Sequence, residues 1–266
     1  MKPQLNFSLI NIDKPSGPTS FQISDFVRKS LNLKKTSHMG TLDPQVTGVL
    51  PITLGRACKL SQYFMHKEKT YVGVMRLHSE VPLSTLNIHI KNVIGKITQL
   101  PPVRSAVKRA PRQRTIHSFK ILEKKDKDVL FETQVEAGTY IRKLIHDLGE
   151  KIGGAHMLEL RRTKAGIFDE STAVTLYEFE SLIQNNQLHT ILVPAEEAIK
   201  KVLPEIQLKE DNLKQLLDGK PLMKSDIKTK LPKEEIFATF LDERFIAIYR
   251  KVQEGDIIAK AEFVYN

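Results

Sequence analysis

The sequence predicts an α+β protein in which a large mixed domain is followed by a small β-rich one. In the first three quarters of the chain, strand-like runs of β-branched residues are interspersed with apolar residues at helical spacing. Beyond about residue 200, strand-like runs separated by turn residues dominate. The length of 266 residues suits one large domain followed by a small one.

The chain opens with a predicted strand and a predicted capped helix. SLINI at residues 8–12 is β-forming and leads into a turn at residues 14–18, where prolines and a glycine exclude regular structure. Thr19 or Ser20 can cap the helix that follows, and a second helix is expected after Gly55. The apolar positions of these two helices are Ile23, Phe26, Val27 and Leu31, then Ala57, Leu60 and Phe64.

Two strands and an amphipathic helix are expected in the middle of the chain. TYVGVMRLH at residues 70–78 is rich in β-formers, and VLFETQVEA at residues 129–137 alternates apolar and polar residues. After Gly138, apolar residues at helical spacing predict a helix that ends at the glycine pair of residues 153–154. Its apolar stripe consists of Ile141, Leu144, Ile145, Leu148 and Ile152.

A domain boundary is expected near residues 195–205, so we divide the chain into residues 1–200 and 201–266. The second, short part contains FATFL and FIAIYRK on either side of a turn, followed by IIAKAEFVY. These three runs predict a compact β-rich module.

Composition excludes several classes of protein. No apolar stretch approaches the roughly 18–20 residues that span a bilayer, so we expect no membrane partner. The single cysteine, Cys58, allows neither an internal disulfide nor a zinc site built from thiolates. We therefore expect a cytoplasmic protein without a cofactor.

Histidines offer an alternative site. His38, His78, His146 and His156 could in principle bind a metal together with Asp43 or Asp147. None of them has metal-ligand spacing such as HExxH, so no metal is expected.

Net charge indicates a polyanionic partner. The chain carries a net charge of +10, and residues 1–199 hold 28 basic against 19 acidic residues, a net of +9. Such an excess favours RNA or DNA binding, although a solvated basic surface is the alternative. The densest stretch is PPVRSAVKRAPRQR at residues 101–114, whose prolines disfavour a helix. Its candidate RNA-binding residues are Arg104, Lys108, Arg109, Arg112 and Arg114.

One segment concentrates polar side chains between backbone breakers. In TSHMGTLDPQVTGVL at residues 36–50, two glycines and a proline predict an irregular loop. That loop can project Thr41, Asp43 and Thr47 into a cleft. The alternative is that Asp43 only shapes a turn, as Asp-Pro pairs often do.

Five ordered blocks resemble the TruB and dyskerin family of pseudouridine synthases. The segment KTSHMGTLDPQVTGVLPITLGRACK resembles the signature of the family. Short motifs such as VTGVLP, GVMRLH and LIHDLG are similar to those of its archaeal and eukaryotic dyskerin type. The residues after about 200 resemble the PUA RNA-binding module. The other four blocks are NIDKPSGPTS at 11–20, KTYVGVMRLH at 69–78, AGTYIRKLIHDLG at 137–149 and GAHMLELRRTKAG at 154–166.

The resemblance implies a fold and a reaction. The fold would be a catalytic domain with a mixed, largely antiparallel sheet, followed by a small PUA-like β-barrel. The reaction would detach uracil from its sugar at N1 and reattach it through C5, without a cofactor. By resemblance Asp43 is the nucleophile, attacking either the ribose C1′ or the uracil C6, and Arg142 forms a salt bridge to it.

Further site residues are carried over by the same resemblance. Tyr71 would stack on the target base and take part in proton transfer, and His38 would help to hold the flipped nucleotide. Tyr140 and Leu160 would line the uracil pocket. Supporting residues are also expected: Lys14 and Pro15 would buttress the loop of Asp43, and a helical Arg161–Arg162 pair would contact phosphates or remain solvated.

The resemblance also implies partners, and a nucleolar location only if the source is a eukaryote. The chain would act on uridine-55 of tRNA, or on rRNA selected by an H/ACA guide RNA with small accessory proteins. The alternative is a non-enzymatic RNA-binding scaffold, and replacement of Asp43 separates the two because a scaffold would tolerate it.

Overall fold

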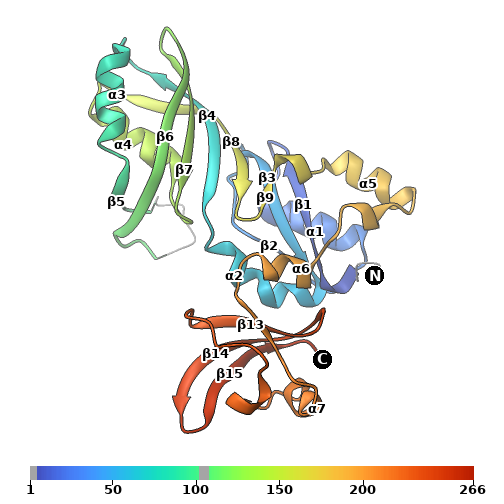
Figure 1. The fold of residues 1–266 in the computed structure, drawn as a ribbon. Helices are drawn as coiled ribbons and strands as arrows, with labels where there is room; N and C mark the ends of the chain where they lie inside the picture. The colour runs from blue at the N-terminus through green and yellow to red at the C-terminus, as the bar shows by residue number, and fades with distance from the viewer. Residues whose placement is uncertain (1–4, 102–107) are drawn as a thin grey trace. The chain divides into compact units, whose positions relative to one another are not determined.

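The computed structural model describes residues 5–101 and 108–266, and the chain forms two compact units, Met1–Leu192 and Val193–Asn266 (Figure 1). The boundary between the units lies a few residues before the position 200–201 expected from the sequence. No helix in the described ranges is both long and apolar enough to cross a membrane.

The first unit combines one large sheet with helices. Its strands are β1 (Ser8–Lys14), β2 (Thr36–His38), β3 (Thr47–Leu54), β4 (Lys69–Leu77), β5 (Gly95–Gln99), β6 (Arg112–Lys125), β7 (Asp128–Val135), β8 (Ala155–Ala165) and β9 (Phe168–Asp169). Its α-helices are α1 (Ser20–Ser30), α2 (Ser61–Met65), α3 (Leu83–Lys91), α4 (Ile141–Glu150) and α5 (Leu176–Gln184). Short 3-10 turns occur at Leu5–Phe7, Gly55–Leu60, Glu170–Thr172 and Leu188–Thr190.

Strand order in this sheet is β1-β3-β8-β4-β7-β6-β5, with β2 added to β3 and β9 added to β8. Strands β3 and β8 run parallel, and the other pairs named here are antiparallel. The predicted α+β class with a mixed, largely antiparallel sheet is therefore confirmed. The parallel pair matters because it brings the start of β3, just after Asp43, beside the middle of β8.

Two apolar clusters hold helices against this sheet. The first contains the stripe of α4, with Leu144, Ile145 and Leu148 buried against the sheet residues Val129 and Phe131. Burying a side chain of this size stabilises a fold by about 1.5–3 kcal/mol, so these contacts fix α4 firmly. The position of Arg142, in the first turn of α4, follows from that packing.

In the second cluster Ile23 and Val27 of α1 pack with Ile10, Ile52 and Phe179. Helix α1 starts with a capping box, in which the side chain of Thr19 accepts a hydrogen bond from the Gln22 backbone and the Gln22 side chain returns to Thr19. This start fixes the turn that precedes α1.

Several expectations of local structure were wrong. Residues 36–50 are not irregular throughout, because β2 and β3 leave only residues 39–46 as a loop. The segment after Gly55 forms a 3-10 turn and the short α2 rather than one helix. Arg161 and Arg162 lie on a strand, not a helix, since β8 is inserted between β3 and β4 and pairs with both.

The second unit contains a five-stranded sheet of order β11-β13-β14-β15-β12, in which β11 and β13 are parallel. Phe237 and Tyr249 stack in its core, which also buries Ile246 and Leu216. The three expected strands are present as β13, β14 and β15. The elements of this unit are β10 (Val193–Pro194), α6 (Ala195–Lys200), β11 (Glu205–Gln207), α7 (Leu213–Leu217), β12 (Leu222–Met223), a 3-10 turn (Lys224–Asp226), β13 (Ile236–Leu241), β14 (Arg244–Glu254) and β15 (Ile257–Val264).

Candidate active site

The loop of residues 39–46, called the Asp43 loop below, is held from within by Lys14. Lys14 ends β1 and is fully buried, and its ammonium donates hydrogen bonds to the carbonyls of Pro15 at 2.9 Å, Pro44 at 2.9 Å and Val46 at 2.8 Å. Burial lowers the pKa of Lys14, while the nearby carboxylate of Asp43 raises it and Arg162 lowers it further. The predicted supporting contact of Lys14 is thus a set of bonds to the loop backbone, whereas Pro15 is exposed.

The first residue of α1 and the turn before this helix hold the same loop on both sides of Asp43. Ser20 Oγ accepts a hydrogen bond from the Leu42 amide at 2.8 Å and donates one to the Leu42 carbonyl at 3.0 Å. On the other side, the amide of Gly17 donates to the carbonyl of Pro44 at 2.9 Å. Asp43 is therefore presented from a backbone that is fixed at both neighbouring residues.

Arg142 meets Asp43 from α4. Its Nη1 lies 3.4 Å from Asp43 Oδ2, and the two side chains are 65% and 55% exposed. Tyr140 caps α4 and is clamped to Gln99: the Tyr140 amide donates to Gln99 Oε1 at 3.0 Å, and Gln99 Nε2 donates to the Tyr140 carbonyl at 3.2 Å. The ion pair is thus open to solvent while the backbone on each side of it is fixed.

Two further predicted residues, Tyr71 and Leu160, belong to the apolar cluster that reaches the Asp43 loop. Both are 8% exposed, and the cluster also contains Leu42 and Val46 of the loop. Gly73 on β4 allows a close approach to Leu160 on β8, because a Cβ at Gly73 would lie 3.0 Å from Leu160 Cδ1. The fold therefore brings Asp43, Arg142, Tyr71 and Leu160 into one region.

Arg162 is a site residue whose surroundings differ from those expected from the sequence. It is 1% exposed, so it cannot contact phosphates at the surface. Its Nε donates to the carbonyl of Val49 at 2.8 Å and its Nη2 to that of Gly40 at 3.1 Å. Desolvation lowers the pKa of Arg162, and Tyr71 opposes this effect by its charge interaction and by a hydrogen bond.

Glycines make room for this arginine. A Cβ at Gly48 would lie 2.2 Å from the Arg162 carbonyl oxygen, and one at Gly40 would lie 3.3 Å from Arg162 Nη1. Both glycines have positive φ, 107° at Gly40 and 101° at Gly48, a region that disfavours other residues. In the sequence these two glycines indicated only an irregular backbone, and their relation to Arg162 follows from the structure.

His38 and Lys69 lie near the same buried cation. Burial and the charge of Arg162 lower the pKa of His38, whose Nδ1 is buried without a hydrogen-bond partner. The same two causes lower the pKa of Lys69 to about 8. The Lys69 ammonium donates to the carbonyl of Met65 at 2.6 Å and also to that of Lys67.

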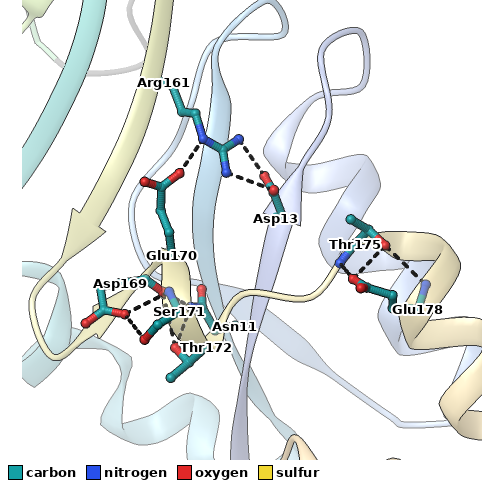
Figure 2. A network of polar contacts seen from close by, with 9 residues as sticks. All are labelled: Asn11, Asp13, Arg161, Asp169, Glu170, Ser171, Thr172, Thr175 and Glu178. Carbon is teal, nitrogen blue, oxygen red and sulfur yellow. Dashed lines mark hydrogen bonds and ion pairs between the residues drawn. The ribbon is translucent and has the colours of Figure 1, made fainter.

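Arg161 lies on the face of β8 opposite to that of Arg162, and its guanidinium is paired with two carboxylates. It donates two hydrogen bonds of 2.9 Å to Asp13 and a further one to Glu170, as Figure 2 shows. The expectation of a phosphate contact or a solvated side chain was therefore wrong for Arg161. In the same view, Asp169 accepts hydrogen bonds from Ser171 beside this network.

The basic run of residues 101–114 lies partly before β6 and partly on it, because β6 begins at Arg112. Arg104 lies outside the described residues, and Lys108 and Arg109 are exposed before the strand. Arg112 Nη2 donates to the Lys108 carbonyl at 3.4 Å. Arg114 lies 3.6 Å from Glu136 and packs against Gly138, so its charge is already paired.

One group of residues in the described ranges could hold a metal ion. The ligand atoms of His146, Asp147 and Glu150 on α4 lie within 4.8 Å of one another. The ammonium of Lys143 already pairs with Asp147, which opposes a cation there.

Family models match this chain over most of the first unit. Residues 28–141 match the N-terminal domain of TruB family pseudouridylate synthase, and residues 142–200 match the C-terminal domain of tRNA pseudouridylate synthase B. A probable tRNA pseudouridine synthase B of Thermococcus onnurineus is 38% identical over 97% of this chain and 75% of its own length. The chain belongs to the TruB family of pseudouridine synthases. It is therefore an RNA pseudouridine synthase, an isomerase.

Further relatives fit this assignment. The Nanoarchaeum equitans protein of the same name is 46% identical over 74% of this chain, which spans 58% of that relative's length. Among solved structures, a Cbf5-Nop10-Gar1 complex matches with a TM-score of 0.88 and 36% identity over 98% of this chain and 85% of the matched one. An H/ACA RNP bound to a substrate RNA containing 2′-deoxyuridine matches with a TM-score of 0.86 and 33% identity, covering 98% and 86%.

Proposed function

We propose that this chain converts chosen uridines of RNA to pseudouridine with the carboxylate of Asp43 as nucleophile. The observation that carries the proposal is the Asp43–Arg142 ion pair on a loop fixed by Lys14, Ser20 and Arg162. A carboxylate attacks only when ionised, and the guanidinium of Arg142 together with the buried ammonium of Lys14 stabilises the anion. A nucleophile on a fixed backbone also loses little entropy on approaching its target.

The reaction is an isomerisation. The bond between C1′ and N1 breaks, the uracil turns, and a bond between C1′ and C5 forms, after which the proton on C5 is lost and N1 gains one. Nothing is oxidised or hydrolysed, so the residues present suffice. Attack by Asp43 at C1′ and attack at C6 are both compatible with this outcome.

The apolar residues next to Asp43 suit a flipped base. Tyr71 offers a ring for stacking and a hydroxyl for hydrogen bonding and proton transfer, and Leu160 offers an apolar contact. Tyr140, held by Gln99, is proposed to line the same pocket. His38 is proposed to help hold the flipped nucleotide.

For the choice of uridine we favour guidance by an H/ACA RNA with small accessory proteins. The two solved structures described above support this, since one is named as a complex with Nop10 and Gar1 and the other as an H/ACA RNP with substrate RNA. The names of the curated relatives favour tRNA as a second substrate, which for this family is uridine-55. Both substrates fit an excess of positive charge in residues 1–199.

For the second unit we propose a PUA-like RNA-binding role. Its five strands with a central β13-β14-β15 meander agree with the resemblance seen after residue 200. A nuclease-protection assay on the full chain, with and without replacement of exposed lysines in this unit, tests that role.

The proposed function is tested by mapping pseudouridine at nucleotide resolution. The purified chain is assayed alone, and then with accessory proteins and a guide RNA, on a tRNA transcript and on an rRNA fragment complementary to the guide. We expect product at the guided uridine only when guide and accessory proteins are present. Full turnover on tRNA alone with no guided product would instead make this chain a stand-alone tRNA enzyme, and no product on any RNA would leave the scaffold alternative.

A further inference from the structure

The buried charged side chains of the first unit are all positive. Among its described residues, the charged side chains that are buried are Lys14, Lys69 and Arg162, all of them cations. No carboxylate is buried with them in that part of the chain. Burying a charge without a buried counter-ion costs free energy, which hydrogen bonds to neutral carbonyls offset only in part. The retained charge therefore calls for a reason beyond stability.

Arg162 links three parts of the site through one planar group. Its guanidinium accepts no bond but donates to the carbonyls of Gly40, within the Asp43 loop, and of Val49, on β3 after the loop. Its backbone lies opposite Gly48 on β3 and opposite Tyr71 on β4 in the sheet register. Tyr71 and Arg162 thus face each other across the β4–β8 pair, and the interaction with Tyr71 opposes the lowering of the Arg162 pKa.

We propose that Arg162 is a positioning residue that couples the Asp43 loop to Tyr71, so that carboxylate and phenol approach the target nucleotide as one rigid unit. This inference rests on the proposed function. The guanidinium is planar and its donors have fixed directions, so contacts on one edge constrain those on the other. A lysine keeps the charge but has no such fork, so it cannot hold the Gly40 and Val49 carbonyls together while facing Tyr71 on the neighbouring strand.

Lys14 does not duplicate this role. Its three hydrogen bonds go to Pro15, Pro44 and Val46, all of them backbone carbonyls within the two adjoining loops. Arg162 alone, among the described residues in these contacts, reaches from the loop to the base-stacking candidate on β4.

A double-mutant cycle tests the coupling. Arg162→Lys, Tyr71→Phe and the double variant are compared in single-turnover assays with the RNA that the wild-type chain modifies. We expect Arg162→Lys to lower kcat roughly 10- to 100-fold with RNA affinity nearly unchanged, as for a small misplacement of reacting groups. Tyr71→Phe should lower kcat by a factor at least about 10-fold smaller in the Arg162→Lys background than in the wild-type background, because the effects of coupled residues are not additive. If the decrease in kcat of the double variant equals the product of the decreases in the two single variants, the proposal is overturned.

Arg161→Lys is the matched control. Arg161 is the neighbouring residue on β8, but successive side chains of a strand point to opposite faces, and its partners are Asp13 and Glu170. We expect this variant to retain the wild-type kcat. A decrease equal to that of Arg162→Lys would show that removing any arginine from β8 has the same effect, and the specific coupling would be wrong.

Hydrogen exchange gives a readout that depends on neither activity nor the folding of Arg162→Lys. In Tyr71→Phe, which removes one hydroxyl, the amides of residues 39–50 should exchange several-fold faster than in the wild type, while those of α5 stay unchanged. Unchanged exchange in the loop would contradict the coupling. If the wild-type chain forms no pseudouridine, the proposed function fails, yet this measurement still decides whether Tyr71 and the loop are linked.

Discussion

Asp43 and Arg142 are 99 residues apart in sequence, yet Oδ2 of the first lies 3.4 Å from Nη1 of the second. The long connection contains strands β3 to β7 of the sheet, and the ion pair exists because β3 and α4 are both anchored to that sheet. Both side chains remain more than half exposed, so substrate can reach the carboxylate without a rearrangement of the backbone.

Replacement of Arg142 by lysine should lower kcat by roughly 100-fold, with RNA affinity within a few-fold of wild type. An ammonium keeps the charge but cannot present two parallel donors to a carboxylate. Single-turnover kinetics and filter binding on the same preparation separate the two quantities. A wild-type kcat for the Arg142→Lys variant would show that a positive charge at this position is enough for catalysis.

Lys14→Met should destabilise the first unit. Its ammonium is the donor for three loop carbonyls, and removing it leaves those groups without their buried partner. We expect the free energy of unfolding to fall by roughly 2–4 kcal/mol, measured by urea denaturation. The control is Lys34→Met at an exposed position, which should change stability by less than about 0.5 kcal/mol. Equal effects of the two variants would contradict the account of Lys14.

The basic run should contribute unequally to RNA binding. Neutralising Arg109 and Arg112 should reduce the slope of log affinity against log salt by roughly 0.7–0.9 for each phosphate that the variant no longer neutralises. Arg114→Gln should leave that slope almost unchanged, because Arg114 is paired with Glu136. Affinity is measured at several salt concentrations with one RNA. An unchanged slope in the Arg109 and Arg112 double variant would mean that these residues are only solvated.

Local pattern was enough to predict much of the fold. The capped helix α1, the apolar stripe of α4 and the strands β4, β7 and β13 to β15 follow from periodicity and caps within a few residues of their observed bounds. The strand β8 was missed, since its sequence LELRRTK holds polar residues whose partners are supplied by distant strands. Asp13 is the clearest case, because it pairs with Arg161 across the sheet and no local signal shows it.

For the site, the resemblance supplied residues but not their environment. It pointed to Asp43, Arg142, Tyr71 and Leu160, and the fold brings all four into one region. Burial of Arg162 could not be predicted from composition, because an arginine pair is ordinarily solvated. Its burial depends on the tertiary position of β8 between β3 and β4, where Gly48 lets the backbones approach closely and Gly40 leaves room for the side chain.

Lys69 should give stability a distinct pH dependence. Burial, then the charge of Arg162, lowers its pKa from about 10.5 to about 8. Between these two values the unfolded chain binds more protons at Lys69 than the folded one, so its contribution to the free energy of unfolding rises with pH. Relative to Lys69→Met, the wild type should therefore gain up to about 3 kcal/mol between pH 8 and pH 10.

Urea denaturation of both chains at pH 7, 8, 9 and 10 measures this difference, and other lysines cancel in it. The exposed control Lys34→Met should run parallel to the wild type over the same range. A constant difference between wild type and Lys69→Met would show that Lys69 keeps its ordinary proton affinity in the folded chain.

The central claim is that the carboxylate of Asp43 performs the reaction, and Asp43→Asn tests it most directly. The amide keeps the size and shape of the side chain but is no nucleophile. Pseudouridine is mapped after incubation of wild type and variant with the RNA that the wild type modifies, and RNA affinity is measured in parallel. The account predicts unchanged folding, RNA binding within a few-fold of wild type and no detectable pseudouridine; product formed by Asp43→Asn at the wild-type rate would contradict it.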